Sequence, residues 1–233
     1  QAENEQLFGT AASPHGHGHD YRARLTTRAA DATHLSACIA GLVAELDHRN
    51  LNAEVAGLRD SPITTEMLSA YIFRRACGTV PLDRVRLHER SDFFAEYNAA
   101  GQHLLGLQVP FSASHRLQSY EHSEEQNAAM YGKCNNPRGH GHLYISEASI
   151  GGALDERSGT LCNFVDFQNA MGESVRAWDN RHLDLETEEF RRRPSTGENI
   201  VQVLWEKTAP LLWGRLERLR LWETANNRFT LRK

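Results

Sequence analysis

Three histidines have the types and spacing of metal ligands. His140 and His142 are two positions apart in the segment YGKCNNPRGHGHLY, residues 131–144. On a strand, side chains at i and i+2 point to the same face, so both imidazoles can reach one ion. His115, in the alternating segment 109–117, is the candidate third ligand. Three histidines without a fourth protein ligand are typical of an open, catalytic zinc site, and the alternative is three surface histidines in a chain that has twelve.

The composition describes a globular chain without a strong charge bias. Its 233 residues carry a formal net charge of −4, which gives no electrostatic case for nucleic acid or a membrane surface. No apolar run approaches the ~18 residues of a transmembrane helix, and no secretory signal is visible. The four cysteines form no CxxC pair or disulfide framework, so we expect a reducing, cytoplasmic setting.

The elements that must position these histidines occur twice. Segments that align without gaps, in the same order, are FGTAASPHGHGHDY (8–21) with 131–144, LDHRNLN (46–52) with WDNRHLD (178–184), ITTEMLSAYIF (63–73) with STGENIVQVLW (195–205), and VRLHERS (85–91) with LRLWETA (219–225). A repeat of about a hundred residues is too long for a solenoid unit and indicates two tandem copies of one small domain. We expect residues 1–100 to form the first copy and 107–233 the second. The first strand of the first copy would lie upstream of Gln1, so we expect the chain given to begin inside a domain.

Hydrophobic periodicity predicts the same elements in both copies. The predicted strands are Tyr21–Arg28, Arg84–Arg90, Phe93–Asn98, Val109–Leu117, Leu143–Gly151, Glu217–Glu223 and Arg228–Arg232. The predicted helices are Ala32–Leu46, Thr64 or Thr65 to Ala76, Asp166–Trp178 and Gly197–Leu212, and Ala99–Leu105 is predicted to link the copies. Each copy is therefore β-β-α-α-β-β, an α+β fold with an antiparallel sheet and both helices on one face.

Taken together, these motifs resemble the 6-pyruvoyl-tetrahydropterin synthase family, in a tandem form. The motifs are FSASHRL (111–117), Glu124-Glu125 to Asn127, YGKCNNPRGHGHLY (131–144), GENIVQVLW (197–205) and LWETANN (221–227). The resemblance implies the tunnelling fold, whose four-stranded units assemble side by side into a barrel. It also implies conversion of 7,8-dihydroneopterin triphosphate with elimination of triphosphate.

The resemblance assigns a role to each matching residue. It implies that His115, His140 and His142 bind zinc, that Cys134 is the catalytic thiol and that Glu223 anchors the pterin. An Asp-His pair from a neighbouring domain would complete a triad with the cysteine.

The residue types suit that chemistry. Zinc polarises substrate oxygens, and a thiol near a metal and a histidine can shuttle a proton. A carboxylate such as Glu223 can accept the two parallel N–H groups of a pterin edge, and its alternative role is a solvated glutamate at a strand end.

The two copies depart from the family pattern in complementary ways. The first copy has Ala11 in place of Cys134 but keeps the pair Asp47-His48. The second copy keeps the thiol but has Asn180 in place of the histidine, and asparagine cannot shuttle protons near neutral pH. His182 is displaced by two residues from the motif position.

We therefore hypothesise one composite site that combines Cys134, the zinc histidines and Glu223 with Asp47 and His48. The opposite boundary should be inactive, with His17, His19 and Glu89 as a relic or a structural zinc site. The alternative is that one copy has simply decayed. Alternating copies need an even number of units, so two chains in a four-unit ring is the simplest closed homo-oligomer.

Other functions remain open at this point. A sister group of the family makes 6-carboxytetrahydropterin for queuosine synthesis, although the six-residue gap between Cys134 and His140 favours the pyruvoyl type. A non-catalytic pterin-binding protein is a second alternative, and a zinc-stabilised scaffold is disfavoured because a structural site normally has four ligands. The triphosphate contacts cannot be assigned, and Arg49, Arg116, Lys133 and Arg138 are candidates by charge alone.

Overall fold

A computed structural model of the chain describes residues 18–27, 32–59 and 61–233. The described residues fall into two compact units. Unit 1 lies within Gln1–Gly106 and Ile150–Asp166, and unit 2 comprises Leu107–Ser149 and Phe167–Lys233. None of the described helices is both long and apolar enough to cross a bilayer.

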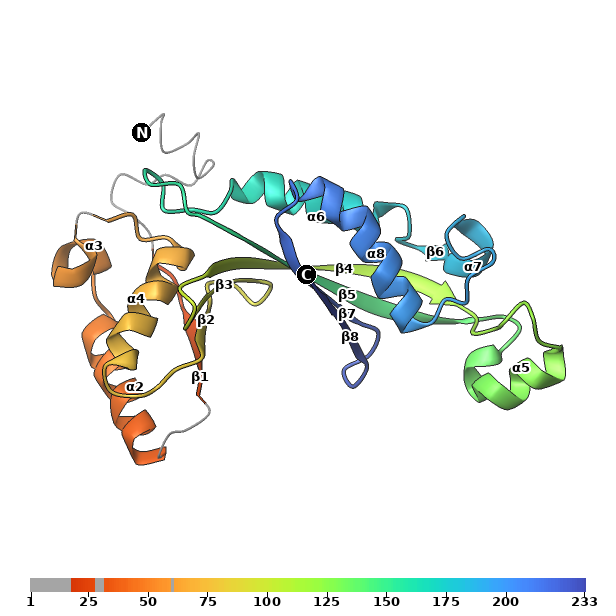
Figure 1. The fold of residues 1–233 in the computed structure, drawn as a ribbon, viewed down its shortest axis with the longest axis horizontal. Coiled ribbons are helices and arrows are strands. Elements are labelled where there is room, and N and C mark those ends of the chain that lie inside the picture. The colour runs from red at the N-terminus through yellow and green to blue at the C-terminus, as the bar shows by residue number, and fades with distance from the viewer. Residues whose placement is uncertain (1–17, 28–31, 60) are drawn as a thin grey trace. The chain divides into compact units, whose positions relative to one another are not determined.

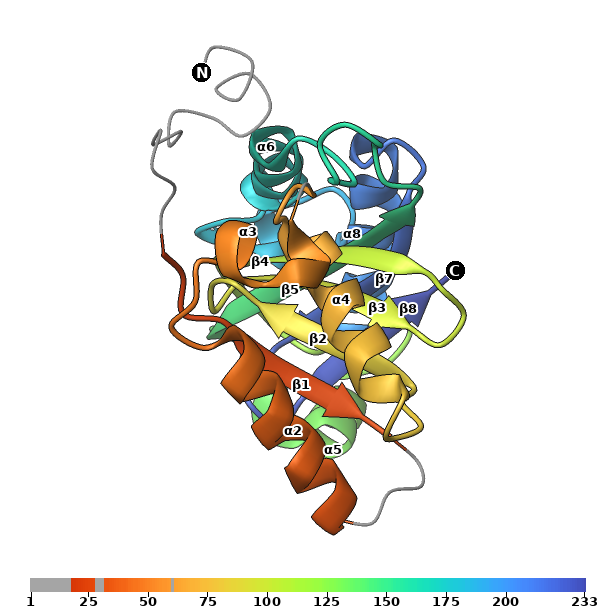
Figure 2. The same cartoon turned by 90° about the vertical axis from the view of Figure 1, so that its left-hand side faces the viewer.

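Unit 1 is built on an antiparallel three-stranded series in the order β1-β2-β3. These strands are β1 (Arg22–Thr26), β2 (Arg84–His88) and β3 (Phe93–Asn98), and the unit's helical segments are α2 (Ala32–Leu46), α3 (Leu51–Glu54), η1 (Ala56–Leu58) and α4 (Thr65–Cys77). The strands alternate as a half-buried sheet requires, with Val85 and Leu87 of β2 buried against Leu68 and Ile72 of α4. Figure 2 looks onto the side of the unit where α2 and α4 cover the strands.

Unit 2 has four neighbouring strands in the order β4-β5-β7-β8. They are β4 (His103–His115), β5 (His140–Gly152), β7 (Leu216–Trp222) and β8 (Arg228–Arg232), and a short β6 (Arg181–His182) pairs in parallel with β4. The helical segments are α5 (Glu124–Tyr131), η2 (Gly132–Asn135), α6 (Phe164–Arg176), α7 (Leu183–Glu186) and α8 (Gly197–Leu211). Figure 1 shows α6 and α8 on the same face of this sheet.

The core of unit 2 is aromatic beneath the candidate histidines. Phe111 of β4 stacks on Tyr144 of β5 with ring centroids 5.0 Å apart, and Trp178 packs against Phe111 and Phe190. All four side chains are at most 2% exposed. Large rings with few rotatable bonds give the strand ends a rigid base at low entropic cost.

The turn after α2 in unit 1 and the turn after α6 in unit 2 share several details. His48 and Asn180 occupy the same position and both have positive φ, 55° and 59°. Arg49 pairs with Glu54 at 3.1 Å, and Arg181 pairs with Glu186 at 2.9 Å. The aligned segments 46–52 and 178–184 thus fold alike, which supports the repeat found in the sequence.

The predicted α+β class with an antiparallel sheet is confirmed, but the strands of each unit form an open series rather than a closed barrel. Helix α2 has the predicted bounds, and Thr64 caps α4 by accepting a hydrogen bond from Met67 N. One prediction needs correction, because β4 begins at His103, inside the predicted link Ala99–Leu105. Helix α5 was missed in the sequence.

Candidate metal centre and active site

The structure brings the three predicted ligands together at one end of unit 2. His115 is the last residue of β4, and His140 and His142 are the first and third residues of β5. One ligand atom from each lies within 4.8 Å of the others, as a single metal ion requires. Strand β5 begins at His140, three residues before the predicted strand Leu143–Gly151, so the HGH segment lies on a strand as its spacing requires.

Buried hydrogen bonding fixes the orientation of His115. Its ring is 1% exposed, and its Nδ1 atom lies 2.7 Å from the carbonyl oxygen of Ser195. Because a carbonyl can only accept, Nδ1 carries the proton and Nε2 presents a lone pair. An imidazole whose second nitrogen donates to a carbonyl is the usual arrangement of a histidine that binds a metal.

Unpartnered buried atoms show that the residues present fit a metal ion. His115 Nε2, His142 Nε2 and His140 Nδ1 are all buried without a hydrogen-bond partner among the described residues. Buried polar nitrogens normally have partners, so these atoms mark a place for a ligand. Three imidazoles suit Zn²⁺ and other borderline transition metals.

Burial also favours the neutral imidazoles that a metal needs. It lowers the pKa of His115, and the hydrogen bond to Ser195 opposes this only in part. It likewise lowers the pKa of His140, with help from neighbouring His142, while the carboxylates of Glu223 and Asp184 oppose the shift. Metal binding requires deprotonated ligands, so both rings are ready to bind at neutral pH.

Glu223 lies at the rim of the histidine cluster, immediately after β7. Its Oε1 atom is 3.5 Å from His115 Nε2 and 3.9 Å from His142 Nε2, and its side chain is 13% exposed. Asn227 Nδ2 donates to the other oxygen, Oε2, at 3.2 Å. Beneath it, burial and the charge of Glu223 raise the pKa of Tyr144, so that phenol stays neutral. Glu223 is therefore a fixed carboxylate that faces the space beside the imidazoles.

Cys134 lies in η2, on the loop that connects β4 to β5. Its side chain is half-buried, and its carbonyl accepts a hydrogen bond from Leu117 N at 2.9 Å. This bond ties the cysteine's backbone to a point two residues beyond His115. The thiol is not one of the three ligand groups of the histidine cluster.

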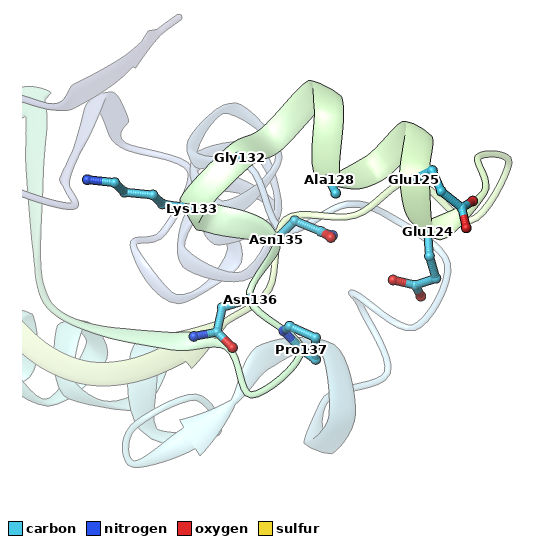
Figure 3. A pocket seen from close by; sticks show the side chains of 8 residues that line it. All are labelled: Glu124, Glu125, Ala128, Gly132, Lys133, Asn135, Asn136 and Pro137. Carbon is cyan, nitrogen blue, oxygen red and sulfur yellow. The ribbon is translucent and has the colours of Figure 1, made fainter.

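A pocket of about 630 Å³ adjoins this loop. It is lined by Glu124 and Glu125 of α5 and by Lys133, Asn135 and Asn136 around η2, and Figure 3 shows the Lys133 side chain extending away from the two glutamates. Neither the histidines nor Glu223 line it. We therefore place the candidate active site at the histidine cluster and not in this pocket.

The Asp-His pair predicted from the first copy lies in unit 1. His48 Nδ1 is 3.0 Å from Asp47 Oδ1, and their side chains are 92% and 61% exposed. In unit 1, His19 Nδ1 also lies 3.6 Å from Glu89 Oε1. The predictions for Ala11 and His17 fall outside the described residues.

Two of the triphosphate candidates have local partners. The Arg116 guanidinium donates to the Asn135 side chain at 3.2 Å and pairs with Glu124. Arg49 pairs with Glu54. Both arginines therefore hold local turns together, which weakens the case for them as phosphate ligands.

Sequence reasoning missed the contribution of the turn 182–184. His182 Nδ1 lies 3.8 Å from Asp184 Oδ2, and Asp184 Oδ2 also accepts from Arg116 N at 2.8 Å. A Cβ atom at Gly139, next to His140, would lie 2.7 Å from His182 Nε2. The only signal in the sequence was the displaced histidine, His182, in the second copy.

Comparisons with known proteins place the chain in a family. The family model described as 6-pyruvoyl tetrahydropterin synthase matches residues 3–100 and 105–233. The human 6-pyruvoyl tetrahydrobiopterin synthase is 37% identical over 121 residues, which is 51% of this chain and 83% of the human protein. The corresponding enzyme of Dictyostelium discoideum is 36% identical over 118 residues, 50% of this chain and 86% of that protein.

A solved structure matches as well. The 6-pyruvoyl tetrahydropterin synthase of Caenorhabditis elegans aligns with a TM-score of 0.55 and 31% identity, over 57% of this chain and 96% of that chain. Together with the family model, which matches residues 3–100 and 105–233, these matches lead to one conclusion. The chain belongs to the 6-pyruvoyl tetrahydropterin synthase family.

Proposed function

We propose that the protein is a zinc-dependent 6-pyruvoyl-tetrahydropterin synthase that converts 7,8-dihydroneopterin triphosphate with loss of triphosphate. The observation that carries this proposal is the cluster of His115, His140 and His142, of which His115 is buried, with Glu223 at its rim. Relatives that carry the synthase name are 36–37% identical over about half of this chain and most of their own length, which supports the pyruvoyl-type assignment.

The metal would be held by His115, His140 and His142, with one coordination position open to substrate. Zn²⁺ bound there would polarise the side-chain oxygens of the substrate and acidify the neighbouring C–H groups. Glu223 would accept the ring N–H and the amino N–H of the pterin, which are parallel donors that one carboxylate can bind together. This pairing would orient the substrate so that its side chain faces the imidazoles.

Proton transfer in this proposal belongs to Cys134, His48 and Asp47. Cys134 would move a proton at the substrate side chain, His48 would exchange that proton, and Asp47 would hold the imidazolium. This assignment is supported because each copy lacks a residue that the other keeps. The second copy has Asn180 in place of the histidine, and the first has Ala11 in place of the cysteine. The high exposure of His48 and Asp47 is what a pair that acts on another domain's substrate requires.

A shared site of this kind constrains the assembly. Each thiol-bearing second copy must meet a first copy, so the copies must alternate, and a ring of alternating copies has an even number of units. We propose two chains in a four-unit ring. Native mass spectrometry should give a dimer of chains, whereas a stable monomer or a trimer of chains would contradict the ring.

Turnover of the zinc-loaded chain tests the function. The protein is incubated with 7,8-dihydroneopterin triphosphate, and the products are identified by mass. We expect triphosphate and 6-pyruvoyl-tetrahydropterin as products, and we expect Cys134→Ala to lose them. The control is His122→Ala, which removes an exposed histidine just before α5 and should leave product formation unchanged.

Other outcomes would change the assignment. A carboxytetrahydropterin product would move the chain to the sister activity within the same family. Tight pterin binding without any turnover would make it a binding protein.

A further inference from the structure

The turn between β6 and α7 lacks the side-chain helix cap that the aligned turn of unit 1 has. In unit 1, Asn50 precedes α3, and its side chain caps the helix by accepting a hydrogen bond from Ala53 N at 3.2 Å. The aligned residue in unit 2 is His182, which precedes α7 and makes no capping bond. Asparagine is among the best N-cap residues, so histidine at this position sacrifices local stability. The remainder of the turn is the same in both units, because Glu54 and Glu186 each accept from the backbone of the capping position.

The imidazole of His182 instead lies against the loop that enters the metal centre. Gly139 has φ +70°, and a Cβ atom there would lie 2.7 Å from His182 Nε2 and 3.0 Å from the carbonyl oxygen of His115. Only glycine fits between these atoms at this φ. His182 therefore packs on the residue immediately before His140, while β6 pairs with β4 one residue before His115, at Ser114.

Asp184 connects the same turn to the other ligand strand. Its side chain is 1% exposed, and Oδ2 accepts from the backbone of Arg116, the residue after His115. Its second oxygen, Oδ1, is buried without a hydrogen-bond partner among the described residues, as is His182 Nδ1. Two buried atoms of the turn 182–184 thus have unused hydrogen-bonding capacity beside the candidate ligands.

We infer that His182 and Asp184 form an outer shell that positions the metal ligands His115 and His140. Asp184 fixes the end of β4, and His182, backed by Asp184, holds the Gly139 turn that aims His140 at the ion. Outer partners of metal-binding histidines set ring orientation and tune affinity, and their loss commonly weakens binding by about 10- to 100-fold. The inference rests on the metal centre proposed above and adds two residues that act through the ligands.

Metal affinity of the full chain tests this inference without any need for turnover. The metal-free protein is titrated with Zn²⁺ against a chromophoric chelator, and with Co²⁺ to record the visible spectrum of the site. His182→Asn and Asp184→Asn install the residues that unit 1 carries at the aligned positions, Asn50 and Asn52, so the turn should still fold. We expect both variants to bind Zn²⁺ about 10- to 100-fold more weakly and to shift the Co²⁺ spectrum.

Two controls separate the possible failures. Glu186→Gln disturbs the same turn without touching Gly139 or Arg116, and we expect it to bind Zn²⁺ as the unsubstituted chain does. Equal weakening by Glu186→Gln, or unchanged affinity in His182→Asn and Asp184→Asn, would overturn the outer-shell role. His140→Ala should lose the metal, and if it does not, the metal centre and the proposed function fail together.

Discussion

The Nδ1 atom of His115 lies 2.7 Å from the carbonyl oxygen of Ser195, and this contact joins the end of β4 to the start of α8. The same ring therefore serves two purposes, since one nitrogen holds the fold and the other faces His140 and His142. In unit 2, the candidate metal centre and the start of α8 share this side chain.

Replacement of His115 should thus cost more than replacement of His142. His115→Ala removes a ligand and leaves the buried Ser195 carbonyl without its donor, which costs about 1–3 kcal/mol of unfolding free energy even without metal. His142 Nε2 has no hydrogen-bond partner among the described residues, so His142→Ala should lose metal with a smaller loss of stability. Metal content and denaturant unfolding of the metal-free variants measure both effects, and equal destabilisation by the two would contradict the dual role.

Glu223→Gln should weaken pterin binding specifically. Glutamine keeps the size of the side chain, but its amide cannot accept two parallel N–H groups with a full negative charge. We expect affinity for a dihydropterin to fall by about 10- to 100-fold, the range for loss of a charge-assisted pair. Fluorescence titration of the metal-loaded protein measures this.

The matched control for Glu223 is Glu217→Gln, because Glu217 precedes the site on the same strand and pairs with Lys233 at 3.7 Å. Its pterin affinity should stay unchanged. A common fall in both variants would show a general charge effect and not an anchor.

Gly139→Ala should damage the metal centre through contact and not only through backbone strain. A non-glycine residue at positive φ costs roughly 1–2 kcal/mol by itself. Gly139 has φ +70°, and a Cβ atom there would clash with His182 Nε2 and the carbonyl oxygen of His115. Gly214 has φ +72° and no atom within 4 Å of its Cβ position. Gly214→Ala therefore measures the strain alone. We expect only Gly139→Ala to lose Zn²⁺ affinity, and similar behaviour of the two variants would refute the close packing.

A buried carboxyl in unit 1 should make that unit less stable as pH rises. Burial raises the pKa of Glu66 to about 7, although its side chain accepts a hydrogen bond from Leu161 N at 3.0 Å. Because the folded state holds this proton more tightly than the unfolded chain, the stabilisation is complete below about pH 4.5 and is lost between there and about pH 7.

Glu66→Gln tests this effect, since the amide stays neutral and still accepts from Leu161. It should recover on the order of 3 kcal/mol at about pH 8 and little at about pH 4. Urea unfolding at the two pH values is the measurement. A gain that does not depend on pH would contradict ionisation as the cause.

The sequence predicted the parts of the site that depend on strand periodicity. The i, i+2 spacing of His140 and His142 placed both rings on one face, and His115, on the alternating segment 109–117, was the candidate third ligand. These contacts follow from two neighbouring strands. Helix α5 was missed because it has no apolar face: among its side chains, only Asn127 is buried.

The outer shell could not be predicted because it depends on a long-range pairing. His182 reaches Gly139 only because β6 pairs with β4, where Ser114 lies opposite His182. A two-residue strand is too short to produce a recognisable hydrophobic pattern in the sequence. The one clue in the sequence was His182, which is displaced by two residues from the motif position.

The central claim is that one copy supplies the thiol and the other supplies the histidine. Turnover of zinc-loaded His48→Ala tests it most directly, with His122→Ala as the control. We predict that the rate of pterin product formation falls by about 100-fold or more, as expected for loss of a general acid-base group, while zinc content and Glu223-dependent pterin binding stay unchanged. Full turnover by His48→Ala would contradict the shared site and direct attention to His182.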